Sequence, residues 1–411
     1  MIKAKIDDLA IFGAAPAFQR KLHVGCPNIG RRESFFRRLN DLLDKRLLTN
    51  NGPLVQEFEE GIARLTGARH CIAMCNATTG LEIAARALEL KGEVIVPSFT
   101  FIATVHSLKW QEITPVFCDI DPATHNIDPK KAEALITPRT TGILGVHLWG
   151  RPCNIEALAE IADRYKLKLF FDAAHAFGCS FKRRMIGNFG EAEVLSFHAT
   201  KFLNTFEGGA VLTNNDILAK KIRLMKNFGF VGYDRVAYIG ENGKMSEVSA
   251  AMGLSGLEAM DDFVAANTLN YKEYVKGLSG LPGVSMVRYD ESEKCNFQYI
   301  VLEIDEEFGH IDRDSLMNVL WSENILARRY FYPGCHRQEP YRSDPLWEGL
   351  KLPETEKISE RVILLPTGTN INPDDARIIC QIIRLAIEHA CVVRERLAKM
   401  SDAEKQQFGT Y

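Results

Sequence analysis

The chain has 411 residues, of which 46% are hydrophobic and 25% are charged, and its formal net charge is −3. This composition is typical of a soluble globular protein that is long enough for two domains with a large buried core. Because the charge is nearly balanced, nucleic acid and anionic membrane surfaces are not expected as partners.

The first residues and the cysteines narrow the class of protein further. Asp7 and Asp8 stand where a signal peptide needs an apolar core, and no stretch approaches the roughly 20 apolar residues of a membrane span. We therefore expect a cytoplasmic protein. The ten cysteines include no CxxC pair and lack metal-ligand spacing, so we expect reduced thiols and no metal site.

In chain order, the predicted elements begin with a surface arm that is rich in glycine and proline. Two helices should follow, the first from residue 33 to the turn cluster TNNGP and the second from Leu54 to about Leu65. Short apolar runs then alternate with amphipathic helical segments such as 80–90 and 155–166. The runs that we interpret as buried strands are 70–75, 92–97, 114–120, 141–148, 168–173, 192–197 and 210–215.

This alternation predicts an α/β fold in which helices cover both faces of a mostly parallel sheet. The segment from about 245 to 278 is predicted to be helical and long enough to bridge two domains. A strand at 296–305 and helices near 313–323 and 373–398 predict a smaller α+β unit. The expected division is an arm at 1–32, a large domain at 33–265 and a small C-terminal domain at 266–411.

Polar residues follow two consecutive predicted strands, where open α/β sheets bind ligands. Asp172 follows three apolar positions, so its carboxylate should be partly desolvated and should need a positive partner, although it could simply cap the next helix. Ser196 and Thr200 are hydroxyl donors of the kind that hold a phosphate. Lys201 follows them, before a Gly-Gly pair that allows a ligand close to the backbone. On its own, such a lysine is usually a solvated surface charge.

A third candidate is the string NATTG at 76–80, between a predicted strand and a predicted helix. A helix N-terminus offers free N–H groups and the positive end of the helix dipole, which together suit a phosphate. An ordinary N-cap has the same composition, so this string is weak evidence alone. No G-x-G-x-x-G stands at this junction and no Walker A motif occurs, so nucleotide cofactors are not indicated.

Together, these motifs resemble the DegT/DnrJ/EryC1/StrS family of sugar aminotransferases, which are pyridoxal 5′-phosphate (PLP) enzymes of fold type I. The resemblance extends from LTNNGPLV (48–55) to LLPTGT (364–369). It includes the strings PSFTFIAT (97–104), VHLWGRPC (146–153), FDAAHAFG (171–178), SFHATKFLNTFEGG (196–209) and KMSEVSAAMGL (244–254). The resemblance implies the aspartate-aminotransferase-like fold, with PLP held by the chain.

The family pattern implies a catalytic pair and two ring contacts. Lys201 would form the Schiff base with PLP and, once released by substrate, would shuttle a proton. Asp172 would keep the pyridine nitrogen protonated, which makes the ring an electron sink. Phe101 matches the aromatic residue that stacks on the ring, and His175 matches a position beside its O3′ side.

The same pattern implies how the cofactor phosphate is bound. The N–H groups of Ala77 and Thr78 and the hydroxyl of Ser196 would bind it, and Asn242 would reach it from the second subunit. The resemblance therefore implies a homodimer with shared active sites. Ala77 departs from the glycine more usual in this turn and tolerates fewer backbone angles.

Within the family, the chain is similar to the C4 aminotransferases of dTDP-4-keto-6-deoxyglucose, through DDLAIFG, CNATTGL, SFHATK and ARRYFYPGCH. This implies transfer of the amino group of L-glutamate to a nucleotide-linked ketosugar, in deoxyaminosugar or cell-surface polysaccharide biosynthesis. Some relatives are dehydratases with histidine in place of the lysine, so Lys201 favours the aminotransferase. The substrate candidates, which could equally be ordinary packing residues, are Arg328, Tyr330, Phe331 and His336.

Two alternatives stay open at the level of sequence. The first keeps the chemistry and changes the substrate to another oxo-sugar, as in the formation of an 8-amino-3,8-dideoxy-octulosonate. The second is a catalytically idle relative that binds PLP or sugar. The intact set of Asp172, Ser196 and Lys201 argues against an idle protein, because binding alone needs no Schiff-base lysine.

Overall fold

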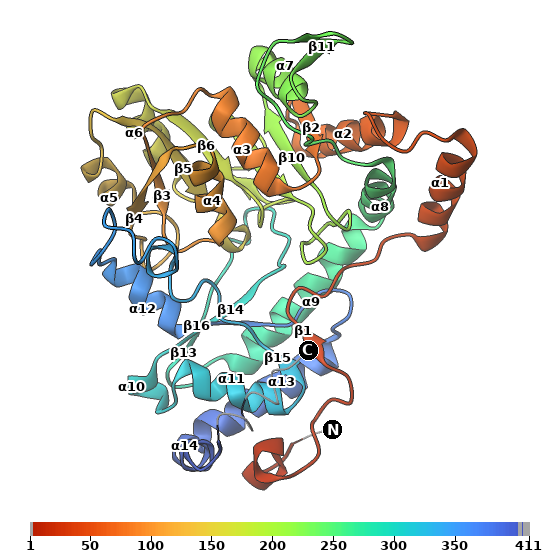
Figure 1. Cartoon of the computed structure of the whole chain (residues 1–411). Coiled ribbons are helices and arrows are strands. Elements are labelled where there is room, and N and C mark those ends of the chain that lie inside the picture. Colours follow the sequence, from red (N-terminus) through yellow and green to blue (C-terminus); the bar gives the residue numbers. More distant parts are fainter. Residues whose placement is uncertain (1–2, 402–404, 406–411) are drawn as a thin grey trace.

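The computed structural model describes residues 3–401 and 405. Figure 1 shows a central sheet with its helices in the upper half of the view and a smaller sheet with its own helices in the lower half. The helix α9 (Met260–Leu278) runs between the two parts. In the described residues, no helix has the length and apolar character that crossing a membrane requires.

The central sheet has seven strands in the order β2-β10-β9-β6-β5-β3-β4. Only β10 is antiparallel to its neighbours, so the other strands end at one edge of the sheet. All seven predicted strands are confirmed, and so is the mostly parallel α/β fold. Their bounds are β2 (His70–Met74), β3 (Glu93–Pro97), β4 (Thr114–Cys118), β5 (Thr140–Val146), β6 (Lys168–Asp172), β9 (Ala192–Ser196) and β10 (Gly209–Thr213).

Helices cover both faces of this sheet. Because alternate residues of a strand point to opposite faces, neighbouring residues pack against different helices. In β2, Ile72 packs with the helices α3, α4 and α7, whereas Ala73 belongs to the core that includes α2, α6 and α8. The helix α2 buries Val55, Phe58 and Ile62, which share one helical face at spacings of three and four. The bounds are α1 (Arg32–Lys45), α2 (Pro53–Thr66), α3 (Ala77–Ala87), α4 (Ile102–Trp110), α5 (Pro129–Ala134), α6 (Ile155–Tyr165), α7 (Asp216–Met225) and α8 (Glu247–Leu257).

The smaller sheet is antiparallel, in the order β13-β14-β16. It lies beside the C-terminal helices in Figure 1. The strands are β13 (Val284–Met286), β14 (Ile300–Ile304) and β16 (Val362–Leu365), and the helices are α10 (Glu306–Gly309), α11 (Arg313–Ser322), α12 (Pro353–Arg361), α13 (Pro373–Glu388) and α14 (Ala390–Ala398). Two short hairpins lie outside these two sheets. They are formed by β7 (Ser180–Phe181) with β8 (Arg184–Met185), and by β11 (Phe230–Gly232) with β12 (Arg235–Val236).

Two helical segments that the sequence presented as continuous are broken. The segment 245–278 forms α8 and α9, which are separated at Ala259, where the backbone leaves the helical region at φ −115° and ψ 9°. The segment 373–398 breaks at His389, at φ −117° and ψ 32°. Neither residue is glycine or proline, so packing of the two halves, rather than a local breaker signal, places each break.

The N-terminal arm packs against the small sheet's side of the molecule. Its strand β1 (Leu22–His23) pairs in parallel with β15 (Ile325–Leu326). Nearer the start of the chain, the Lys3 ammonium lies 3.2 Å from the Glu323 carboxylate, and both side chains are buried. The arm is therefore an anchored part of the structure as well as a surface segment.

Charged side chains cover the outer side of β2, which is an edge strand of the central sheet. The Glu59 carboxylate accepts the Ala73 N–H at 2.8 Å, and Lys226 donates to the Ala73 carbonyl at 3.2 Å. Arg223 donates to the Cys71 carbonyl at 2.9 Å, and both cations also pair with Glu59. These contacts satisfy backbone groups that a sheet edge leaves open.

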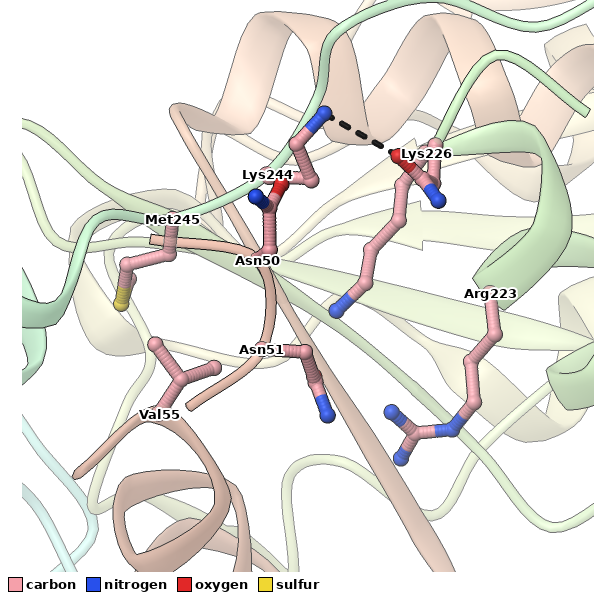
Figure 2. Close-up of a pocket in the computed structure, with 8 residues that line it drawn as sticks. Asn50, Asn51, Val55, Arg223, Lys226, Lys244 and Met245 are labelled. Atoms are coloured by element: carbon pink, nitrogen blue, oxygen red, sulfur yellow. Dashed lines mark hydrogen bonds between the residues drawn. The ribbon is translucent and has the colours of Figure 1, made fainter. Parts of the chain in front are cut away.

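A cavity of about 270 Å³ lies next to this edge and is lined in part by Arg223, Lys226 and Lys244 (Figure 2). The Lys244 ammonium donates to the Asn227 side chain at 3.1 Å. All three cations thus have hydrogen-bond partners within the chain. The cavity lies along the edge of the sheet.

Candidate active site

Asp172 is the last residue of β6, and two hydrogen bonds hold its carboxylate. The Thr104 hydroxyl donates to Oδ2 at 2.8 Å, and the Ala174 N–H donates to Oδ1 at 3.0 Å. The Thr104 hydroxyl, in the first turn of α4, also lies 2.9 Å from that of Thr100, which precedes the helix. All of these side chains are buried. The structure therefore fixes the direction of the carboxylate before any ligand is present.

Lys201 lies in the loop that follows β9, the strand next to β6 in the sheet. Its N–H donates to the carbonyl of His198 at 2.8 Å, which closes a turn at the strand end. Burial lowers the pKa of the Lys201 ammonium to about 8, although the nearby Asp172 carboxylate acts in the opposite direction. The structure thus brings these two residues together at the ends of adjacent strands.

The N-terminus of α3 faces the start of β10. The Asn76 side chain accepts the Thr79 N–H at 2.8 Å, while Ala77 and Thr78 occupy the first helical positions, whose N–H groups have no partner within a helix. A side chain on Gly209 would place its Cβ only 2.7 Å from the Ala77 nitrogen. Ser196 is paired with Gly209 across β9 and β10, so the three proposed phosphate contacts gather at one end of the sheet.

An apolar surface adjoins these groups. Phe101 directly precedes α4, and its side chain is 60% exposed, although its carbonyl oxygen accepts the Thr104 N–H at 3.0 Å. Large apolar side chains are normally buried in the protein, and an exposed one is more often found where a ligand or partner covers it. An exposed aromatic ring one helical turn from the hydroxyl that holds Asp172 suits a planar ligand.

His175 is buried in a stack of aromatic rings. Its ring centroid lies 4.2 Å from that of Tyr299 and 5.8 Å from that of Trp149. The backbone N–H of Trp149 donates to Nδ1 of His175 at 3.3 Å, so Nε2 carries the proton of the neutral imidazole. Burial, with a contribution from the Lys201 charge, holds the pKa of His175 well below its usual value, so the ring stays neutral.

The substrate candidates separate into two groups. Tyr330 and Phe331 stack on Trp149 at ring centroid distances of 6.0 Å and 5.5 Å, and they therefore join the wall that contains His175. The exposed Arg328 places its guanidinium 5.5 Å from the Tyr330 ring. His336 is buried elsewhere, with its ring nitrogens 2.7 Å from the Ser98 hydroxyl and 3.2 Å from the Glu356 carboxylate.

Asn242 lies on the segment that leads from β12 to α8. It is exposed and forms an antiparallel bridge with Asn227. The next residue, Gly243, accepts the Cys75 N–H at 2.8 Å, which ties this segment to the end of β2. The segment continues from the hairpin of β11 and β12, which projects from the top of the view in Figure 1.

Sequence reasoning missed three residues of this site: Thr104, Trp149 and Tyr299. Thr104 carried no clear helical signal, because its partner Thr100 precedes α4 and the residues of α4 show no helical period. Trp149 and Tyr299 carried none, since an aromatic residue within an apolar run is indistinguishable from core. Their stacking on His175 depends on long-range packing.

The mostly parallel sheet, with an aspartate and a lysine at the ends of adjacent strands and an open helix N-terminus beside them, has the organisation of an aminotransferase. The chain belongs to the DegT/DnrJ/EryC1/StrS aminotransferase family, which it matches over residues 30–384. Both the α/β fold and the family expected from the sequence are thus confirmed.

Individual relatives agree with this assignment. The chain is 38% identical to a dTDP-4-amino-4,6-dideoxy-D-glucose transaminase of Shigella dysenteriae over 89% of this chain and 99% of that protein. It is 35% identical to an Escherichia coli transaminase of the same name, over 88% and 96% of the two chains. The crystal structure of DesI with its TDP-sugar product is similar at a TM-score of 0.91 and 48% identity, covering 96% of this chain and all of the other.

A more distant structure shares the fold. DesV of S. venezuelae, solved in complex with a ketimine intermediate, matches with a TM-score of 0.81 and 28% identity, over 88% of this chain and 99% of that one.

Proposed function

We propose that this chain is a PLP-dependent aminotransferase that transfers the amino group of L-glutamate to a nucleotide-linked 4-ketosugar and works as a homodimer. The observation that carries the proposal is the placement of Lys201, with its lowered pKa, beside the fixed carboxylate of Asp172. The names of the transaminase relatives and of DesI support a dTDP-linked 4-amino-4,6-dideoxyglucose as the product class.

The residues present fit PLP on observations of this chain alone. The exposed ring of Phe101 offers a flat apolar surface, and the first turn of α3 offers N–H groups to a phosphate. Gly209 leaves the space that such an anion needs against the helix. When bound, PLP supplies an electron sink for the carbon that loses or gains the amine.

The side chains of the site would then have distinct tasks. The Lys201 amine would hold the cofactor and afterwards move a proton, for which its lowered pKa suits it near neutral pH. Asp172, fixed by Thr104 and Ala174, would place a negative charge opposite the pyridine nitrogen. His175 would donate a hydrogen bond from Nε2 as a neutral ring, and the aromatic wall around it would keep water away.

Exposed apolar side chains on two peripheral elements support a homodimer. In the hairpin of β11 and β12 and the segment after it, Tyr233 is fully exposed and Ile239 is 75% exposed. In α1, Phe36 and Leu43 are 50% and 58% exposed. Such apolar surface is typical of protein interfaces, and a second copy of the chain is the partner that we propose.

The proposal is tested by incubating the protein with PLP, L-glutamate and a panel of nucleotide-linked and free ketosugars. Mass spectrometry would show which sugar gains an amine, and borohydride reduction followed by peptide mapping would locate the PLP. We expect PLP on Lys201 and amination of a dTDP-linked 4-keto-6-deoxy sugar. Amination of a free octulosonate instead would replace the substrate, and absence of both PLP attachment and amination would overturn the function.

A variant separates catalysis from binding. Asp172→Asn preserves size but removes the charge, so turnover should fall by several orders of magnitude while PLP remains bound through its phosphate. Near-normal turnover would assign this task to another acid.

A further inference from the structure

The N-terminal arm crosses the loop that carries Lys201, and it does so in close contact. Gly25 has a φ of +75°, and a Cβ at this position would lie 2.9 Å from the Cβ of Thr200 and 3.4 Å from its carbonyl oxygen. Thr200 directly precedes Lys201, and its hydroxyl lies 2.8 Å from Nδ1 of His198. Only glycine combines this backbone angle with this approach.

Three residues further along the arm, the buried Asn28 forms hydrogen bonds with the same loop. Its side-chain amide donates to the carbonyl of Phe202 at 3.0 Å, and its own carbonyl accepts from the side chain of Asn204 at 2.8 Å. Its Oδ1 accepts the N–H of Thr369 at 2.9 Å, in the turn after β16. Asn28 is 1% exposed, so these bonds are shielded from water.

The arm therefore contacts the loop on both sides of the lysine, at Thr200 before it and at Phe202 and Asn204 after it. We propose that Gly25 and Asn28 are positioning residues for Lys201, because they set the path of the loop 198–204 and so hold the amine beside Asp172. The functional meaning rests on the proposed role of Lys201. The placement of the lysine can be measured without the cofactor.

Small displacements of this loop should have measurable consequences. A shift of about 1 Å in a reacting group can reduce a rate about 100-fold, because orientation is lost before the reaction begins. A displaced lysine should also gain contact with water. Its pKa, which burial lowers to about 8, should then rise toward the ordinary value of 10.5.

The chain offers a matched pair of glycine variants. Gly25→Ala combines backbone strain with a contact to Thr200. Gly13→Ala imposes similar strain, at a φ of +99°, in a part of the arm where nothing lies within 4 Å of the new Cβ. Asn28→Asp is a second variant that keeps the size of the side chain and the acceptor for Thr369, but replaces the donor to Phe202 with an oxygen.

The first measurement uses the protein without PLP. Competitive acylation with acetic anhydride as a function of pH, read by mass spectrometry of the Lys201 peptide, reports the pKa of this amine. We expect a midpoint near 8 in the parent protein and in Gly13→Ala, and a higher midpoint in Gly25→Ala and Asn28→Asp. Circular dichroism and the melting temperature identify the variants that are folded, and Asn28→Asp carries the test if Gly25→Ala does not fold.

The second measurement adds PLP and follows its attachment to Lys201 by absorbance and borohydride trapping. The attachment rate should fall about tenfold or more in Gly25→Ala and Asn28→Asp, and should stay near the parent value in Gly13→Ala. The inference is overturned if folded Gly25→Ala and Asn28→Asp titrate and react like the parent protein. Failure of the parent itself to attach PLP would overturn the proposed function, while the acylation comparison would still decide the inference about the arm.

Discussion

The chemistry of the site at the residue scale depends on two opposed effects on one amine. Burial disfavours the charged form of Lys201, whereas the Asp172 carboxylate favours it, and burial prevails because the resulting pKa is about 8. At neutral pH, about a tenth of the amine would then be uncharged, which is far more than for an ordinary lysine. An uncharged amine is the form that can attack an aldehyde.

The rate at which PLP attaches to the cofactor-free protein should therefore rise with pH, with a midpoint near 8. Asp172→Asn removes the cause that raises this pKa, so the midpoint should move to lower pH. Stopped-flow absorbance over a series of buffers measures both values. Asp7→Asn, a change of an exposed acid in the arm, is the control and should leave the midpoint in place. An unchanged or higher midpoint in Asp172→Asn would contradict the proposed interaction.

At the element scale, sequence predicted the sheet well because each strand is a short apolar run bounded by polar turns. The run KLFFD and the strand β6 coincide, and this coincidence places Asp172 at a strand end. The helix α4 was not predicted, because its polar and apolar residues are spread around all sides and show no helical period. The breaks at Ala259 and His389 carried no local signal either. Contacts between elements decide such features, and a single sequence does not display them.

The approach of α3 to β10 can be tested at this scale with one methyl group. In Gly209→Ala the new Cβ would lie 2.7 Å from the Ala77 nitrogen, so the start of α3 must shift. Overpacking of this kind costs about 1–3 kcal/mol, and tenfold weaker PLP binding corresponds to about 1.4 kcal/mol. We expect weaker PLP binding in equilibrium dialysis. Gly280→Ala, with open space around the new Cβ and outside the proposed interface, should bind PLP like the parent.

At the scale of the whole molecule, the arm joins the lysine loop to the part of the chain around the smaller sheet. The buried pair of Lys3 and Glu323 anchors its first residues. The Lys3 ammonium also donates to the carbonyls of Asp8 and Ala15, both at 2.6 Å. The Glu323 carboxylate accepts the N–H groups of Ala10 and Ala17 at 2.7 Å and 2.6 Å. Every charge in this anchor is thus paired or hydrogen-bonded.

Removing one partner of such a pair leaves a buried charge without compensation. Lys3→Met should therefore lower the free energy of unfolding by about 3–5 kcal/mol, or release the arm, because Glu323 stays buried without its cation. Denaturant unfolding measures the first result, and limited proteolysis of the arm measures the second. Lys5→Met, at an exposed position two residues away, is the control. Equal stability of the two variants would mean that the arm contributes little to the fold.

The proposed dimer makes the most demanding prediction, because it assigns Asn242 to the site of the other subunit. Within its own chain Asn242 is exposed and lies on the segment that leads from the projecting hairpin, so it is available to a partner. Lys201→Ala and Asn242→Ala protomers should each be impaired alone. In a hybrid dimer, one site would carry both defects and the other would carry neither.

Random reassembly of equal amounts makes half of the dimers hybrids, so the mixture should recover about a quarter of the activity of the parent protein. Mixing Lys201→Ala with Asp172→Asn is the control, because both residues are expected to serve their own subunit's site. No hybrid of that pair has an intact site, and its activity should stay at the average of the two variants. Native mass spectrometry verifies that hybrids form in both mixtures. If the mixture with Asn242→Ala also stays at the average, Asn242 acts in its own subunit or in neither.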